Sequence, residues 1–96
     1  MKFEMNEAEK RTLEEIKKGK TEFWFNKSNL SESKEKIEAI FYLQFYGFVN
    51  AELYSDEEKV GQINVSITER GYYNSMNEDE MKKDISEKIN KFIEGN

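Results

Sequence analysis

The sequence predicts an α+β fold of three main helices, one short strand and a two-stranded antiparallel hairpin. Apolar residues recur at helical spacing over residues 6–18, 32–46 and 77–94. Residues 47–71 hold two stretches of alternating apolar and polar residues, separated by the polar segment 55–61, which is expected to form the turn. An aromatic, β-prone segment at residues 21–25 supplies the short strand.

The first expected helix spans residues 6–18. Asn6 is placed to cap it, and Glu9 follows three residues later as the partner in a capping box. The helix is expected to bury Met5, Ala8, Thr12, Leu13 and Ile16. Gly19 is the expected C-terminal stop.

The strand at residues 21–25 places Phe23 and Phe25 on one face and Trp24 on the other. Residues 26–31 are polar and leave room for at most one helical turn. The second expected helix, residues 32–46, takes Ser31 as its cap. Its expected buried stripe is Ile37, Ile40, Phe41, Gln44 and Phe45. Tyr42 is then exposed, because five aromatic residues within eight positions cannot all face inward.

The hairpin begins at Gly47, which is expected to close the helix in a left-handed cap with Phe48 against Leu43. The packed face of the hairpin is predicted to hold Val49, Ala51, Leu53, Ile63, Val65 and Ile67. The solvated face is predicted to hold Asn50, Glu52, Tyr54, Gln62, Asn64, Ser66 and Thr68.

The last expected helix, residues 77–94, has a complete capping box in Asn77 and Glu80 and a stop at Gly95. Its apolar stripe is Met81, Ile85, Ile89, Phe92 and Ile93. This stripe can pack on its own domain or on a second copy, so a homodimer through the helix is one expectation. We expect residues 1–96 to form a single domain with a core over 6–75 and the C-terminal helix over 77–94.

Composition excludes several classes of function. The chain has no Cys and no His, which removes thiol nucleophiles, the usual zinc sites and histidine acid–base chemistry. We therefore expect no enzyme, no cofactor and no metal site. No apolar run approaches the ~20 residues that cross a bilayer, and the N-terminus is not signal-like. A cytoplasmic protein without a membrane partner is the expectation.

The distribution of charge points to the partner. The net charge is −5, and residues 48–70 alone carry two basic and five acidic residues, a net −3. A nucleic-acid backbone attracts the opposite sign. The acidic segments therefore favour a basic protein surface over DNA as the partner.

Three segments carry a resemblance to a known family. These are Tyr46-Gly47-Phe48-Val49, Ile67-Thr68-Glu69-Arg70-Gly71 and Tyr72-Tyr73. With the order of elements over residues 6–75, they resemble a winged-helix domain of the small phage and plasmid regulators, in which residues 47–71 are the wing. In that family the helix before the wing enters the DNA major groove. Only residues 26–30 are available here for the helix that normally braces it, so that second helix is shortened or missing.

Two functions follow as hypotheses. The first is a non-enzymatic regulator of phage or mobile-element origin that contacts a protein partner through an acidic surface, in one form inhibiting a nucleic-acid-binding protein. Its partner-binding residues are Glu32, Glu35, Glu38, Tyr42, Asp56, Glu57 and Glu58. The alternative is a winged-helix transcriptional regulator that binds DNA. Its candidate contacts are Lys34, Lys36, Gln44, Lys59 and Arg70.

Overall fold

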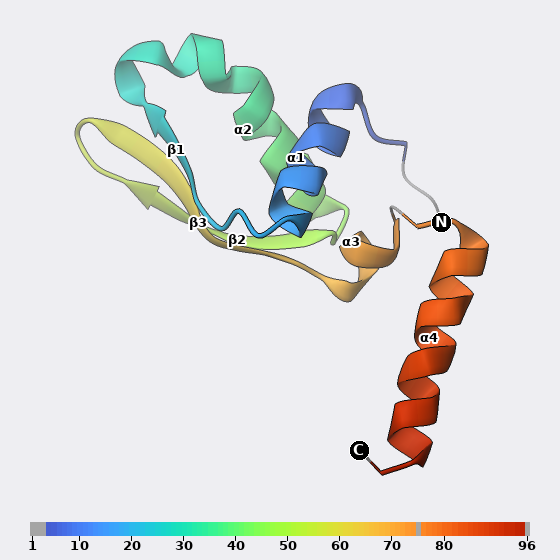
Figure 1. The fold of residues 1–96 in the computed structure, drawn as a ribbon. Coiled ribbons are helices and arrows are strands. Elements are labelled where there is room, and N and C mark those ends of the chain that lie inside the picture. Colours follow the sequence, from blue (N-terminus) through green and yellow to red (C-terminus); the bar gives the residue numbers. More distant parts are fainter. Residues whose placement is uncertain (1–3, 75, 96) are drawn as a thin grey trace.

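The computed structural model describes residues 4–74 and 76–95 and has an α+β fold (Figure 1). Within these residues the elements follow in the order α1 (Glu7–Lys17), β1 (Phe23–Asn26), the 3₁₀ turn η1 (Lys27–Asn29), α2 (Leu30–Phe45), β2 (Val49–Ser55), β3 (Lys59–Ile67), α3 (Glu69–Asn74) and α4 (Glu78–Ile93). The hairpin of β2 and β3 and the helices α1, α2 and α4 confirm the predicted elements. The single turn η1 matches the room expected between the first strand and the second helix.

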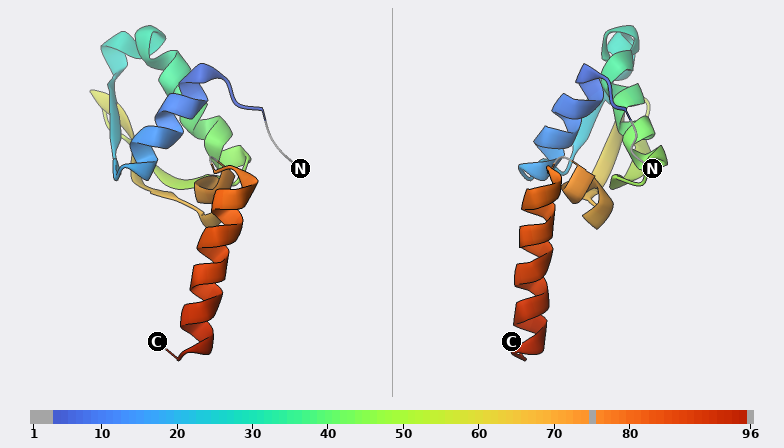
Figure 2. Two further views of the ribbon diagram at one scale, coloured as in Figure 1. Left: turned by 45° about the vertical axis from the view of Figure 1, so that its right-hand side comes forward. Right: turned by 90° about the vertical axis from the view of Figure 1, so that its right-hand side faces the viewer.

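The three strands form one antiparallel sheet in the order β1-β3-β2, so β3 lies at its centre. Helices α1 and α2 lie on the same side of this sheet (Figures 1 and 2). Phe23 and Phe25 of β1 face these helices and are buried, whereas Trp24 points away, as the alternation predicted.

The local signals of α1 are confirmed. The Asn6 side chain accepts a hydrogen bond from the Glu9 backbone N–H at 2.8 Å, and the Glu9 carboxylate accepts one from the Asn6 N–H at 3.2 Å. Glu9 is itself buried, which the sequence pattern did not indicate, and its carboxylate accepts a hydrogen bond from the Tyr46 hydroxyl at 3.3 Å. Gly19 follows the helix with a φ of +109°.

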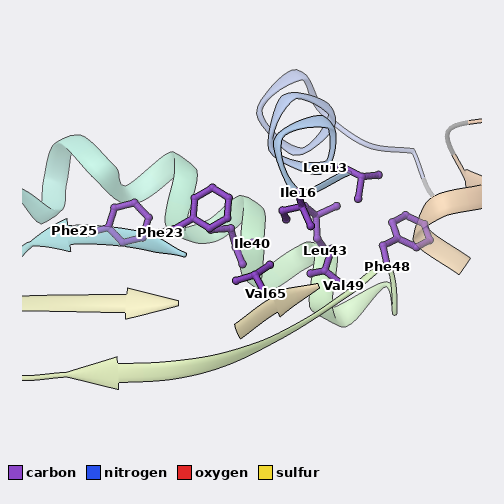
Figure 3. Close-up of a cluster of buried hydrophobic side chains, with 9 residues drawn as sticks. All are labelled: Leu13, Ile16, Phe23, Phe25, Ile40, Leu43, Phe48, Val49 and Val65. Carbon is purple, nitrogen blue, oxygen red and sulfur yellow. The ribbon is translucent and has the colours of Figure 1, made fainter. Parts of the chain in front are cut away.

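The core lies between the two helices and the sheet (Figure 3). It is built from apolar side chains of α1, β1, α2, β2 and β3 and of Phe48, the residue directly before β2. These are Leu13, Ile16, Phe23, Phe25, Ile40, Leu43, Phe48, Val49 and Val65. Burial of this apolar area is the main stabilisation of the fold.

The buried face of α2 differs from the predicted stripe. Phe41 is 46% exposed and Phe45 is 80% exposed, so their predicted burial is wrong. Ile40 is buried as predicted, and Ala39 and Leu43 are buried in place of the two phenylalanines, because α2 packs against α1 as well as the sheet. Among other residues of this helix, Ile37 and Gln44 are half-buried, and Tyr42 is exposed as predicted.

Both ends of α2 can be compared with the sequence. The helix begins at Leu30 after Asn29, whose side chain makes no capping hydrogen bond, so the predicted Ser31 cap is wrong. Its end is as predicted, because Gly47 has a φ of +81° and the Phe48 N–H donates to the Leu43 carbonyl at 2.9 Å.

A β-bulge in β3 overturns the predicted alternation of the second hairpin strand. From Asn50 to Glu52, β2 advances two residues, while β3 advances three between their partners, Ser66 and Ile63. Asn64 lies within this bulge with a φ of +51°. The extra residue reverses the faces on its far side, so Gln62 is buried together with Val65 instead of facing solvent, and Ile63 is only half-buried. The strand also begins at Lys59, so residues 59–61 belong to β3 rather than to the predicted turn.

The short helix α3 was not predicted. The Thr68 side chain begins it by accepting a hydrogen bond from the Gly71 N–H at 3.0 Å, while its hydroxyl donates to the Gly47 carbonyl at 2.6 Å. Gly71 is packed directly on the backbone of Phe48: a Cβ atom at Gly71 would lie 2.1 Å from the Phe48 carbonyl oxygen. This close approach explains why α3 carries a glycine in its interior.

Helix α4 projects away from the rest of the molecule (Figures 1 and 2). With α4 included, the molecule measures 53 × 28 × 19 Å along its principal axes. The Asn77 cap and the stop before Gly95 are as predicted. At its base, the Tyr73 hydroxyl donates to the Asp84 carboxylate at 2.6 Å and accepts from the Lys88 ammonium at 2.5 Å. Within the apolar stripe, Met81 is half-buried and the other four side chains are exposed, with Phe92 at 83%. Among the described residues, no helix combines the length and apolar character needed to span a bilayer.

Candidate functional site

An open apolar groove of about 540 Å³ lies between α2 and the strands of the sheet. One wall is a stripe of α2 made by Leu30, Ser31, Lys34, Ile37, Glu38 and Phe41. The floor and opposite wall include Phe25, Leu53, Ser55, Val60 and Gln62. The volume is within the ordinary range for ligand sites, which are lined mainly by apolar side chains with a few polar groups.

The groove exists because α2 covers only part of the sheet. Leu53 lies on the same face of β2 as the buried Val49, as predicted, yet it is 67% exposed. Phe41 on the opposite wall is also exposed, so two large apolar side chains face water in one groove. Strand β2 has no strand on its outer side among the described residues. An exposed apolar cleft beside a strand edge is a recurrent kind of peptide-binding site.

Gln62 is the exceptional residue of the floor. It is only 3% exposed, and neither its Nε2 nor its Oε1 atom has a hydrogen-bond partner among the described residues. In the strand pairing it lies between Phe23 of β1 and Leu53 of β2. A buried amide without partners is unfavourable, and native proteins contain few of them.

The acidic loop between the two hairpin strands is Asp56-Glu57-Glu58, and it lies at one end of the groove, next to Ser55. The Lys59 and Glu58 backbone N–H groups donate to the Asp56 carboxylate at 2.9 and 2.8 Å, and these bonds hold the pKa of Asp56 below its usual value. Asp56 therefore closes the turn, while Glu57 and Glu58 are exposed. The last two are the carboxylates of this loop that a partner can contact.

The other predicted partner-binding residues lie on α2. Glu38 lines the groove and forms an ion pair with Lys34 at 3.8 Å. Glu32 and Glu35 are exposed but do not line the groove. Tyr42 is exposed one turn beyond Glu38 and stacks on Tyr46 with a centroid distance of 6.4 Å. The structure thus places Glu38 and the acidic loop at one groove and leaves the other three on the adjoining helix surface.

The five DNA-binding candidates are spread over several surfaces, and each makes an internal contact. Lys36 pairs with Glu15 of α1, and the Gln44 amide donates to the Ala51 carbonyl at 3.2 Å. Burial raises the pKa of Glu15, but hydrogen bonds and charge from Lys36 and Lys20 lower it by more, so the net shift is downward. Lys34 pairs with Glu38, as described above. The Lys59 ammonium lies over the Trp24 ring, and the Arg70 guanidinium lies over the Phe48 ring.

The sheet face that points away from α1 and α2 carries a pair of half-exposed aromatic rings. Trp24 and Tyr54 pack edge to face with centroids 5.4 Å apart, and the Lys59 ammonium lies 4.4 Å from the centroid of the Trp24 ring. Gly61 lies between them in β3, and a Cβ atom there would lie 2.5 Å from the indole. A glycine is therefore required for Trp24 to lie flat on the central strand.

Sequence reasoning missed the residues that define the groove. The sequence pattern predicts Gln62 on the solvated face and Phe41 in the core, and it marks neither as a candidate site residue. A signal for Gln62 was present: Asn64 is one of the few residue types that tolerate a positive φ, so it marks a bulge inside an otherwise β-branched strand. Phe41 carried no such signal.

In the described part of the chain, no group of three or more acidic side chains is arranged to hold a metal ion. Comparisons of the chain with protein-family models, with curated proteins and with solved structures found no match.

Proposed function

We propose that this protein is a non-enzymatic regulatory binding protein that holds a segment of a protein partner in the groove between α2 and the hairpin. The observation that carries the proposal is that Phe41 and Leu53, two large apolar side chains, are exposed in the groove formed by α2 and the sheet. Exposed apolar surface of this kind is stabilised when a partner covers it.

Charge defines the partner further. Glu38 stands in one wall, and Glu57 and Glu58 extend from the loop at one end of the groove. A segment that carries apolar residues together with lysine or arginine complements this surface. Basic surfaces of proteins commonly hold nucleic acid, so occupancy by this acidic protein would compete with it. The order of elements supports a winged-helix-like arrangement in which η1 takes the place of the bracing helix, and in this proposal the fold serves protein contact.

The test starts from a random-peptide library displayed on phage and selected on the full-length protein. We expect enrichment of peptides that combine apolar and basic residues, and their affinity is then measured by isothermal titration calorimetry. Leu53→Glu should weaken binding at least tenfold, because it places a carboxylate on the apolar floor. Phe45→Glu is the matched control, since Phe45 is 80% exposed but lies outside the groove.

Absence of enriched peptides, or equal losses in the two variants, would contradict the proposal. Circular dichroism spectra of both variants are compared with that of the wild type to check that the fold is kept. A labelled random-sequence DNA duplex titrated at low salt, ~50 mM, where non-specific binding is strongest, should remain unbound. Saturable binding of that duplex would favour the DNA-binding alternative.

The acidic loop is tested separately by association kinetics. Glu57→Lys together with Glu58→Lys should slow association of a basic selected peptide, with a small effect on dissociation, because these exposed charges act mainly by steering. The effect should shrink as salt is added. An unchanged association rate at low salt would remove the loop from the binding surface.

We also propose that α4 associates with α4 of a second copy. Ile85, Ile89, Phe92 and Ile93 are exposed along one side of this helix, and none of its described residues is buried. Its first turn is acidic and its last turn carries Lys91, so an antiparallel pair brings opposite charges together. Sedimentation velocity should show a dimer that Ile89→Lys abolishes and Asn90→Lys preserves. A monomer at all accessible concentrations would contradict this pairing.

A further inference from the structure

The strongest unexplained feature of the molecule is the Gln62 side chain. The residue is only 3% exposed, both polar atoms of its amide lack partners in the described residues, and it lines the groove. The bulge at Asn64 is what turns it inward, because without the extra residue Gln62 and Val65 would lie on opposite faces. The strand is thus shaped so that a polar group is held beneath an apolar groove.

A side chain of this kind lowers the stability of the free protein. A leucine or methionine would fill the same place without an unpaired amide, and replacing unpaired polar groups by apolar ones of similar shape is neutral or stabilising. The amide offers one acceptor oxygen and two donor hydrogens in one plane. Its natural complement is another amide, which supplies one N–H and one C=O.

We infer that the groove binds an extended peptide segment and that one main-chain peptide unit of this segment pairs with the Gln62 amide. This inference rests on the proposed function and names the chemical group that the groove recognises, a main-chain peptide unit. An extended segment leaves its main-chain N–H and C=O groups free for Gln62, whereas a helix pairs its own, and the carboxylates of Glu38 and the acidic loop favour a basic residue in the segment.

Access to the amide requires a local rearrangement, because its polar atoms are covered in the free protein. Leu53 pairs with Gln62 across the two strands and is two-thirds exposed. Its side chain can turn outward without losing a packed environment. The hydrogen bonds that the segment then makes with Gln62 replace bonds that the free protein lacks, so occupancy of the groove removes an existing penalty.

The test measures stability and binding in the same variant. Gln62→Met keeps the length of the side chain and removes the amide. We expect a higher melting temperature than wild type and an affinity for a library-selected peptide that is at least tenfold lower. A purely structural glutamine predicts the opposite change in melting temperature and no specific change in affinity.

The peptide provides the second arm of the test. Single N-methylation along its backbone should identify one amide whose methylation weakens binding to wild type about tenfold but has little further effect on Gln62→Met. If Gln62→Met does not fold, the side-chain NH₂ resonance of Gln62 in wild type is followed by NMR, and it should shift with the peptide but not with that N-methylated form.

The possible failures are distinguishable. Equal affinity of wild type and Gln62→Met, or an unmoved Gln62 resonance, overturns the main-chain pairing while the groove remains a peptide site by the Leu53→Glu result. A selected peptide that binds as a helix also overturns it. Failure to select any groove-dependent peptide overturns both the inference and the proposed function.

Discussion

Gly71→Ala is a sharp test of the fold because two ordinary rules predict opposite signs. Gly71 lies inside α3, where alanine is the better helix former by about 1 kcal/mol. The added Cβ, however, would lie 2.1 Å from the Phe48 carbonyl oxygen and 2.8 Å from its carbonyl carbon. Both atoms belong to the backbone and cannot rotate away.

The magnitude follows from what must move. Overpacking of this kind costs about 1–3 kcal/mol. Relief requires separating α3 from Phe48, which also loses the 2.9 Å hydrogen bond from the Thr68 N–H to the Phe48 carbonyl. With about 1 kcal/mol for that bond, the net destabilisation is about 2 kcal/mol after the gain in helix propensity. For a domain of this size the melting temperature falls by about 10 °C.

Thermal unfolding followed by circular dichroism measures this change. Ser86→Ala is the matched control, because Ser86 is exposed in α4 and the substitution there tests helix propensity alone. We expect the control to leave the melting temperature unchanged or slightly raised. A melting temperature of Gly71→Ala at or above that of wild type would refute the close approach between α3 and Phe48.

Three further predictions concern the core, the acidic loop and α4. Leu43→Ala, at a position with 0% exposure, should reduce the free energy of unfolding by about 3 kcal/mol in urea titrations, and a loss below about 1 kcal/mol would place Leu43 outside the core. Because the pKa of Asp56 is lowered, its bonds to the loop amides are present above the usual aspartate pKa and are lost as the pH falls through the lowered value. NMR titration of those amides should therefore give a midpoint below that of a free aspartate, and a higher midpoint would contradict the loop geometry. Truncation before Asn77 should leave the melting temperature of a dilute monomeric sample nearly unchanged, since no described residue of α4 is buried, and a large decrease would show that α4 packs on the core.

The parts of the fold that sequence predicted are those set by neighbours along the chain. Asn6 and Glu9 form a capping box, and the Asn77 side chain caps α4 by accepting from the Glu80 N–H, so both helices begin where these neighbouring residues place them. Gly47 likewise closes α2 by a contact with the turn before it. The antiparallel pairing of β2 with β3 follows from the short loop between them.

The groove depends on packing between segments that are far apart in the sequence. The type of a single residue does not predict such packing. Phe41 and Ile40 are adjacent and equally apolar, and only the position of α1 across α2 decides which is buried. The inward turn of Gln62 depends on one extra residue in β3, and a shift of one residue exchanges the two faces of a strand. The acidic character of the loop was readable from sequence, whereas its place at the end of an apolar groove was not.

The position of Trp24 gives the protein a built-in optical reporter. It is the sole tryptophan of the chain, and its indole lies on Gly61, the residue next to Gln62 in the central strand. The emission of a half-exposed indole responds to its contact with water and with a nearby ammonium group such as that of Lys59. If the proposed segment seats against Gln62, any shift of β3 at Gly61 would change the surroundings of the ring on the opposite face of the sheet. Intrinsic fluorescence of unlabelled protein would then report binding in the proposed groove, with the chromophore outside the binding surface.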